Sequence, residues 1–225
     1  MGRAGTLGPE SLVAPAEARR GAYQVKEIFR TLQGEGGLVG TPMVFVRFAG
    51  CNLWSGREED RAGARCDFCD TDFVGGERLD GRGVVERLGA AAAGGPGWIC
   101  FTGGEPLLQL DRALLEAVRG EGYRVAIETN GTVALGALRP LVDWVCMSPK
   151  TEPLAVTSGE ELKLIYRGQP AAAIRRYEGL DFRHFFLQPE WGCRYDELLA
   201  GALAFLEAQP RWRLSLQMHK VVGLR

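Results

Sequence analysis

Short apolar runs recur along most of the chain and are separated by polar, glycine-containing segments. Several of these runs are almost continuously apolar, which is typical of strands that are covered on both faces of a sheet. We therefore predict strands at residues 43–49, 98–101, 123–127, 142–147, 161–166, 184–188 and 213–217.

One of the segments between these strands has clear helical periodicity. Leu114, Leu115 and Val118 share one of its faces, and Gly120 and Gly122 are suited to end the helix before the next strand. Repeated strand–helix units imply a parallel sheet that curls into a full or partial α/β barrel. Because helical stretches are fewer than strands, we expect an incomplete, TIM-like barrel of mostly parallel strands.

Length and charge narrow the class of protein. With 225 residues, 46% of them hydrophobic, the chain fits one domain, which we place at residues 22–225. Residues 1–21 combine Gly, Ala, Pro and charged residues without periodicity, and we expect a flexible N-terminal extension there. The charges of the 27 basic and 28 acidic residues nearly cancel, so neither nucleic acid nor a membrane is an expected partner. Without a secretory signal or a spanning apolar run, we expect a cytoplasmic protein.

Polar residues of unusual kinds follow the predicted strands. In parallel α/β folds the loops at the carboxyl ends of the strands converge on one rim, where the chemistry gathers. We therefore expect one rim to carry Cys51, the segment 102–105, the segment 128–131, the segment 148–150, the segment 188–190 and the segment 217–220.

Three of the six cysteines crowd into one loop of this rim. Cys51, Cys66 and Cys69 form a C-x14-C-x2-C pattern, which can hold three irons of a [4Fe–4S] cluster and leave the fourth iron open to a small molecule. The alternative is a zinc site that takes its fourth ligand from Cys193 or His219. The cysteine spacing by itself is compatible with both interpretations.

A second motif favours the iron–sulfur interpretation. Gly103 and Gly104 permit close backbone approach and expose N–H groups, and Glu105 can accept a hydrogen bond from a ligand ammonium group. The simpler interpretation is a strand-to-helix turn with a glutamate near the helix start.

The cysteine loop followed by GGEP resembles the radical S-adenosylmethionine (SAM) superfamily. Within it, residues 27–54, 66–73, 102–109, 127–132 and 148–150 together resemble the 7-carboxy-7-deazaguanine synthases, and the resemblance covers residues 23–225. The usual superfamily spacing is C-x3-C-x2-C. The longer first interval here is similar to that of a subset of the family, and we expect the insert to fold outward as a surface excursion.

The resemblance implies a lyase that converts 6-carboxy-5,6,7,8-tetrahydropterin into 7-carboxy-7-deazaguanine, with ring contraction and release of ammonia, on the route to queuosine-type nucleosides. It also implies a [4Fe–4S] cluster, SAM and Mg²⁺ as cofactors, an electron donor such as flavodoxin or ferredoxin, and a homodimer. One rival is an activase that makes a protein glycyl radical, against which LQGEG and CDTDF argue. The other rival is a non-catalytic zinc-binding module.

Individual residues receive roles on the same basis. Arg47, inside an apolar run, needs either an internal acid or an anionic ligand, and the family resemblance assigns it to the substrate carboxylate. Thr71 is assigned to Mg²⁺, although capping of the next turn is an equally good local interpretation. His219, Glu128 and Asn130 are left without an assigned partner.

The resemblance also assigns larger sets of residues to the two ligands. Assigned to SAM are Phe68, Cys69, Asp70, Gly104, Glu105, Ser148, Pro149, Lys150, Gln188, Pro189, Glu190 and Trp191. Assigned to substrate, with Arg47, are Leu32, Gln33, Gly34, Glu35, Thr102 and Arg225.

Overall fold

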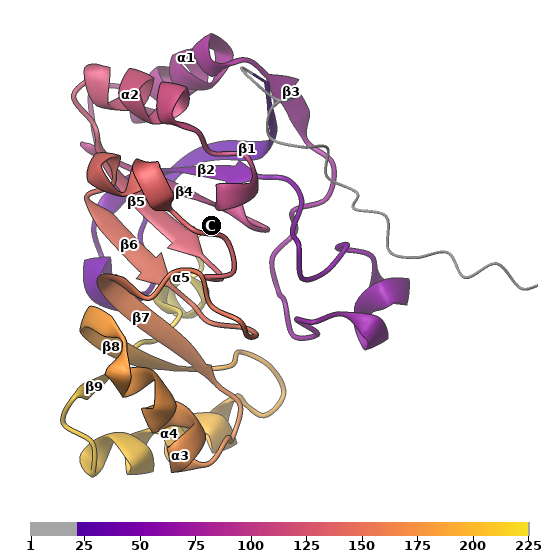
Figure 1. Cartoon of the computed structure of the whole chain (residues 1–225), viewed down its shortest axis with the longest axis vertical. Coiled ribbons are helices and arrows are strands. Elements are labelled where there is room, and N and C mark those ends of the chain that lie inside the picture. Colours follow the sequence, from indigo (N-terminus) through magenta and orange to yellow (C-terminus); the bar gives the residue numbers. More distant parts are fainter. Residues whose placement is uncertain (1–21, 225) are drawn as a thin grey trace, which may run out of the picture.

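One open nine-stranded sheet organises the chain (Figure 1). The computed structural model describes residues 22–224, so the predicted flexible extension at residues 1–21 and the predicted substrate contact Arg225 lie outside the described residues. The strand order is β3-β1-β2-β4-β5-β6-β7-β8-β9. From β2 to β9 each neighbouring pair is parallel, whereas β1 pairs antiparallel with both β2 and β3. The predicted sheet of mostly parallel strands is therefore confirmed.

All seven predicted strands are present, and two further strands extend one edge of the sheet. The strands are β1 (Tyr23–Leu32), β2 (Pro42–Phe48), β3 (Glu77–Leu79), β4 (Trp98–Gly103), β5 (Arg124–Thr129), β6 (Trp144–Met147), β7 (Ser158–Tyr166), β8 (Asp181–Pro189) and β9 (Trp212–Leu214). β1 and β3 were not expected from the apolar runs. β1 is half-buried and interrupted by charge, because it pairs near an edge rather than in the centre.

The helices are α1 (Gly81–Ala92), α2 (Arg112–Gly120), α3 (Ala171–Arg175), α4 (Tyr195–Glu207) and α5 (Met218–Val222). Helices α1 to α4 lie along the outside of the sheet (Figure 1), whereas α5 packs against the segment between β1 and β2 and borders the cavity described below. The predicted helix is α2: Asp111 caps it by accepting a hydrogen bond from the Leu114 N–H at 2.9 Å, and the apolar stripe through Leu115 is buried. None of the helices within residues 22–224 has the length and apolar character that crossing a membrane requires.

Side-chain alternation along the strands separates the two faces of the sheet. Val44, Val46, Ile99 and Phe101 point to one face and join the main hydrophobic core. Residues at the alternate positions point to the inner face of the partial barrel. There, a smaller apolar cluster of Met43, Phe45, Cys100 and Ala126 lies toward the strand starts. The next inward positions, toward the strand ends, are polar and form the site.

The segment between β1 and β2 closes the partial barrel. Although β1 and β9 are far apart in the sheet, the backbone N–H of Met218 donates to the Gly34 carbonyl at 2.8 Å. The Gly36 N–H donates to Ser215 Oγ at 2.9 Å. We call residues 33–37 the floor loop, because these contacts fix it across the inside of the barrel.

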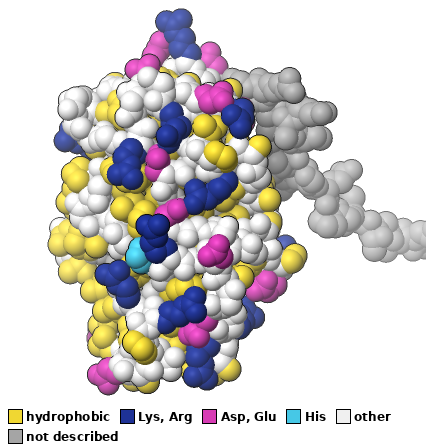
Figure 2. All heavy atoms as spheres, turned by 60° about the vertical axis from the view of Figure 1, so that its left-hand side comes forward, with side chains coloured by type: hydrophobic (Ala, Val, Ile, Leu, Met, Phe, Trp, Pro, Cys, Tyr) yellow, Lys and Arg dark blue, Asp and Glu magenta, His cyan; other side chains and the backbone are white. Residues whose placement is uncertain are grey.

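The outer surface has no dominant charge. On the face shown in Figure 2, basic side chains are interspersed with acidic and hydrophobic ones, in keeping with the balance of 27 basic and 28 acidic residues.

Candidate active site

A cavity of about 370 Å³ lies at the carboxyl ends of the parallel strands. The floor loop forms part of its lining, and the cysteine loop lines it too, so residues predicted from distant motifs meet in one place. The predicted site residues that line the cavity are Leu32, Gln33, Gly34, Glu35, Arg47, Cys51, Cys66, Phe68, Cys69, Asp70, Thr71, Thr102, Gly104, Ser148, Lys150, Gln188, Pro189, Glu190 and Trp191. Glu105 and Pro149 are not part of this lining.

All three loop cysteines line the cavity. The backbone N–H of Leu53 donates to the Cys51 sulfur at 3.4 Å, the kind of bond that tunes thiolate ligands of a cluster. Burial raises the pKa of Cys51 to about 11 and also raises the pKa of Cys66, so iron binding must displace their protons. This all-thiol donor set fits a three-cysteine cluster. Among residues 22–224, no three or more His, Cys, Asp or Glu side chains are grouped as ligands of a single metal ion.

Most of the long insert between Cys51 and Cys66 is exposed, as expected, although Leu53 and Trp54 at its start are buried and the Arg61 side chain turns back toward the cysteine loop. η3 (Glu58–Gly63) carries Arg61, whose Nη1 donates to the carbonyls of Asp67 at 2.8 Å and Cys69 at 3.2 Å. The guanidinium also lies 4.1 Å from the centroid of the Trp54 ring. The insert therefore braces the backbone that carries the two closely spaced cysteines.

Glu105 is fully buried and its carboxylate is committed to the protein. It accepts hydrogen bonds from the Leu107 N–H at 3.0 Å, Thr129 Oγ1 at 2.8 Å and the Asn130 N–H at 2.7 Å. Burial raises the pKa of Glu105 to about 7 against these hydrogen bonds. The structure thus places this predicted ligand contact between two loops rather than in the cavity. Asn130, in turn, donates to Asn52 Oδ1 at 3.1 Å, next to the first cysteine.

Gly104 illustrates why the sequence needs glycine after β4. A Cβ at this position would lie 2.1 Å from the Gly50 carbonyl oxygen and 2.7 Å from Cys51 Cβ. The backbone of this turn therefore packs directly against the start of the cysteine loop. Any side chain there would push the two apart.

Except for Glu105 and Pro149, the residues predicted to contact SAM line the cavity. Two cations lie over the ring of Phe68, with Lys150 Nζ at 5.4 Å and Arg167 Cζ at 4.3 Å from its centroid. Lys150 Nζ is also 2.8 Å from Ser148 Oγ. Burial lowers the pKa of Lys150. Gln188 accepts a hydrogen bond from Ser215 Oγ at 2.7 Å.

The acidic segment after Cys69 is held from both sides. Asp70 forms an ion pair with Lys220 of α5, and Asp72 forms one with Lys26 of β1 at 2.8 Å. Thr71, between them, lines the cavity. The flanking ion pairs fix the backbone on which Thr71 sits.

The floor loop is packed too tightly for larger residues. A Cβ on Gly34 would lie 2.2 Å from Nδ1 of His219, so this histidine closes over the loop. Gln33 donates to Glu128 Oε1 at 2.7 Å, and Gln217 donates to Glu35 Oε1 at 2.9 Å. Two of the three residues left open by the sequence, Glu128 and His219, thus border the floor loop.

The sequence predicts either an internal acid or an anionic ligand as the partner of Arg47. The structure shows an internal acid, and Arg47 also borders the cavity. Its partner is Glu27 on the neighbouring strand, and both side chains line the cavity wall.

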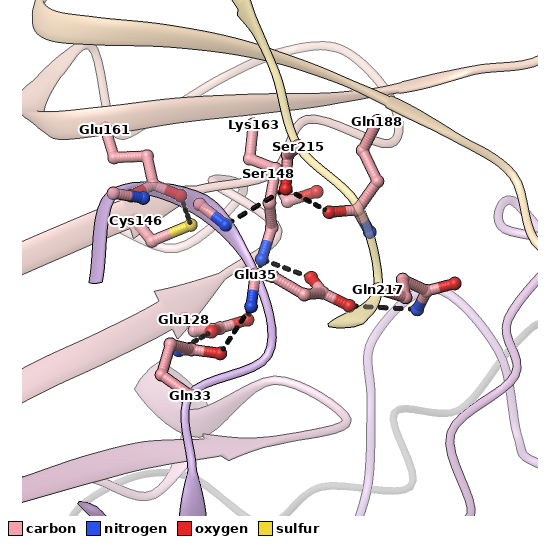
Figure 3. Close-up of polar contacts among 12 residues, drawn as sticks. Gln33, Glu35, Glu128, Cys146, Ser148, Glu161, Lys163, Gln188, Ser215 and Gln217 are labelled. Carbon is pink, nitrogen blue, oxygen red and sulfur yellow. Dashed lines mark hydrogen bonds and ion pairs between the residues drawn. The ribbon is translucent and has the colours of Figure 1, made fainter. Parts of the chain in front are cut away.

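Sequence reasoning missed one charged side chain at the centre of the site. Lys163 of β7 lines the cavity and pairs with both Glu35 and Glu128 (Figure 3). Two residues earlier on the same strand, Glu161 accepts a hydrogen bond from the Gly37 N–H at 2.8 Å. The available signal was a pair of opposite charges at alternate positions of an otherwise apolar run.

Comparison with protein-family models finds no match. The chain is 50% identical to 7-carboxy-7-deazaguanine synthase of Bordetella pertussis over 212 residues, which are 90% of this chain and 99% of the relative. It is 51% identical to the 7-carboxy-7-deazaguanine synthase of Caulobacter vibrioides over 211 residues, again 90% of this chain and 99% of the relative.

The fold also has a solved counterpart. The crystal structure of QueE from Escherichia coli superposes with a TM-score of 0.67 and covers 88% of this chain and 95% of that one. At 24% sequence identity this likeness supports the fold, an open partial barrel.

Proposed function

The chain belongs to the 7-carboxy-7-deazaguanine synthase family, whose lyase activity as radical SAM enzymes it shares, and from this premise we propose how its cavity is used. We propose that Cys51, Cys66 and Cys69 hold a [4Fe–4S] cluster at one end of the cavity, and that the floor loop binds the pterin. The observation that carries the proposal is the joint lining of one cavity by the three thiols and the floor loop.

When bound, the cluster and SAM supply the radical that removes a hydrogen atom from the substrate. The protein must then hold the cofactor beside the cluster. The proposed SAM contacts, besides Cys69, are Phe68, Asp70, Gly104, Ser148, Pro149, Lys150, Gln188, Pro189, Glu190 and Trp191. Glu105, which does not line the cavity, is proposed to support this site by fixing the turn after Gly104.

The substrate that we propose is 6-carboxy-5,6,7,8-tetrahydropterin. Its carboxylate suits Arg47, because a guanidinium binds a carboxylate in a planar, bidentate manner. Its amide and amino edge suits the floor loop, where Gln33 and Glu35 offer donors and acceptors. Leu32, Gly34, Thr102 and Arg225 complete the proposed contacts, and Thr71 is the proposed Mg²⁺ ligand, since hard oxygen donors suit this ion.

We further propose that residues 22–225 act as one domain, because a single sheet runs through the described part of it. An electron donor such as flavodoxin or ferredoxin and a homodimeric state complete the proposal, and both come from the family resemblance.

The experiment is anaerobic reconstitution with iron and sulfide, followed by metal analysis and electron paramagnetic resonance of the reduced protein. We expect about four irons and four sulfides per chain. We also expect SAM to change the spectrum of the reduced cluster. Stoichiometric zinc that resists replacement by iron would contradict the proposal and favour the zinc-binding module.

A further inference from the structure

Lys163 lies at the junction between the sheet and the floor loop. Its side chain is only 3% exposed, and its Nζ is 2.5 Å from Glu35 Oε2 and 3.2 Å from Glu128 Oε2 (Figure 3). Glu35 lies in the floor loop, whereas Glu128 lies near the end of β5. One buried ammonium group therefore joins two carboxylates that are 93 residues apart in sequence (128 − 35).

The remaining oxygens of these two carboxylates are also fixed. Glu35 Oε1 accepts from Gln217 Nε2 at 2.9 Å, and Glu128 Oε1 accepts from Gln33 Nε2 at 2.7 Å. An ionised carboxylate has about four lone-pair sites, so each retains acceptor capacity after these bonds. Because both side chains line the cavity, that capacity is available to a bound ligand.

Two neighbouring carboxylates in a buried site would normally not both remain ionised, because their charges repel and burial penalises each. Burial alone would raise the pKa of Glu35, but the charge and hydrogen bond of Lys163, with help from Gln217, lower it to about 2. Burial would likewise lower the pKa of Lys163, but the acidic groups around it raise that pKa well above its usual value.

Other titratable groups face the same region from the elements packed around Lys163. Glu161 adds a third carboxylate from β7 itself, and Cys146 adds a thiol from β6. Besides Lys163, Lys150 and His219 also interact electrostatically with Glu35. Glu161 accepts a hydrogen bond from the Cys146 thiol at 3.3 Å, whereas Glu35 and Glu128 pair directly with Lys163.

We propose that Lys163 is a positioning residue for the pterin: it balances the charge of Glu35 and Glu128 and holds both side chains in place, so that both accept hydrogen bonds from the N–H edge of the substrate ring. The proposal rests on the proposed assignment of the floor loop to the substrate. Lys163 acts through the two glutamates, which make the contacts with the ring.

The test measures binding of 6-carboxypterin, a stable oxidised analogue, to anaerobically reconstituted enzyme with SAM by titration calorimetry between pH 6 and 8.5. Each variant is compared with wild type at the same pH, which removes the titration of the ligand itself. We expect Lys163→Met to weaken binding about tenfold or more at pH 6, because Glu35 loses its counter-ion and becomes protonated. The ratio to wild type should then shrink as the pH rises and Glu35 ionises again. Lys163→Arg, which keeps the charge, should show no such pH dependence.

Iron content and the circular dichroism spectrum identify variants that have lost the fold. The double variant Glu35→Gln/Lys163→Met removes both charges together and covers the case in which Lys163→Met does not fold. Relative to Glu35→Gln alone, it should lose much less affinity than Lys163→Met loses relative to wild type, because only the contact of Lys163 with Glu128 is left to remove.

If Lys163→Met bound 6-carboxypterin as tightly as wild type, or more weakly by the same factor at every pH, the proposed role of Lys163 would be wrong. It would also be wrong if the double variant lost as much affinity relative to Glu35→Gln as Lys163→Met loses relative to wild type. The substrate assignment would not be affected by either result. Failure of the wild-type enzyme to bind 6-carboxypterin would instead overturn the substrate assignment, and the role of Lys163 with it.

Discussion

Arg47 of β2 and Glu27 of β1 form an ion pair in the cavity wall, with 2.8 Å between Nε and Oε1. Both side chains are about one-fifth exposed, at 21% and 22%, so the pair is partly shielded from water. A guanidinium has five N–H donors, and the contact with Glu27 fixes the plane in which the others point. The pair thus orients Arg47 for a second, anionic partner.

We therefore predict that Arg47→Lys weakens binding of 6-carboxypterin about tenfold, because lysine keeps the charge but loses the bidentate fork. Binding of unsubstituted pterin, which lacks the carboxylate, should change little. The measurement is a pair of titrations with the two pterins on enzyme of equal iron content. An equal loss of affinity for both pterins would show that Arg47 does not bind the carboxylate.

The three cysteines of the loop should each be needed for the cluster. Replacing Cys51, Cys66 or Cys69 by alanine should remove most of the bound iron, because three thiolates are the minimum that holds the cluster at this site. Cys193→Ala is the matched control, since this cysteine is exposed and does not line the cavity. Full iron content in Cys51→Ala would mean that the long insert has displaced the expected ligand.

Arg61 should stabilise the cluster loop without being a ligand. Its hydrogen bonds to the Asp67 and Cys69 carbonyls hold the backbone of the C-x2-C segment. We expect Arg61→Ala to lose its cluster to a chelator several-fold faster than wild type. Arg57→Ala, at an exposed position of the same insert, is the control and should behave like wild type. Identical loss rates for Arg61→Ala and Arg57→Ala would rule out a bracing role.

Because of Glu105, the stability of the folded protein should depend on pH. The pKa of Glu105 rises from 4.5 to about 7 on folding, so the folded state prefers the neutral carboxyl and loses stability as the pH rises from 4.5 to 7. A shift of this size corresponds to about 3 kcal/mol, an order-of-magnitude figure. Glu105→Gln, which stays neutral, should therefore destabilise the metal-free protein more at pH 5 than at pH 8.

Urea unfolding at the two pH values measures this difference. At pH 5 the variant mainly loses acceptor geometry toward Thr129 and Asn130, whereas at pH 8 it also avoids the cost of a buried charge. A larger destabilisation at pH 8 than at pH 5 would contradict the raised pKa.

The sequence predicted the central strands because their apolar runs are nearly continuous, and it missed β1 because Lys26, Glu27 and Arg30 interrupt the pattern there. Charge in an edge-region strand does not distinguish it from a loop. The rim motifs were predictable because each directly follows a strand, and parallel strands end on the same side.

The contacts between motifs could not be predicted in the same way. The motif around Glu105 by itself predicts a ligand contact. In the structure, Glu105 instead accepts hydrogen bonds from Thr129 and Asn130, which lie at the end of a different strand. Lys163 lay within a predicted strand, but its partners Glu35 and Glu128 are known only once the barrel brings β5, β7 and the floor loop together. Arg61 lies in a predicted surface insert, and only the fold shows that its side chain returns to the cysteine loop.

In the proposed mechanism, one cavity brings the cluster, SAM and the carboxylated pterin together for 7-carboxy-7-deazaguanine synthesis. The most direct measurement is anaerobic turnover of the reconstituted enzyme with reductant, SAM, Mg²⁺ and 6-carboxytetrahydropterin, with product and 5′-deoxyadenosine quantified in the same samples. We predict 7-carboxy-7-deazaguanine and one ammonia per product, with many products formed for each SAM consumed. No product from protein with a full complement of iron and sulfide, or one 5′-deoxyadenosine released for every product, would contradict this account.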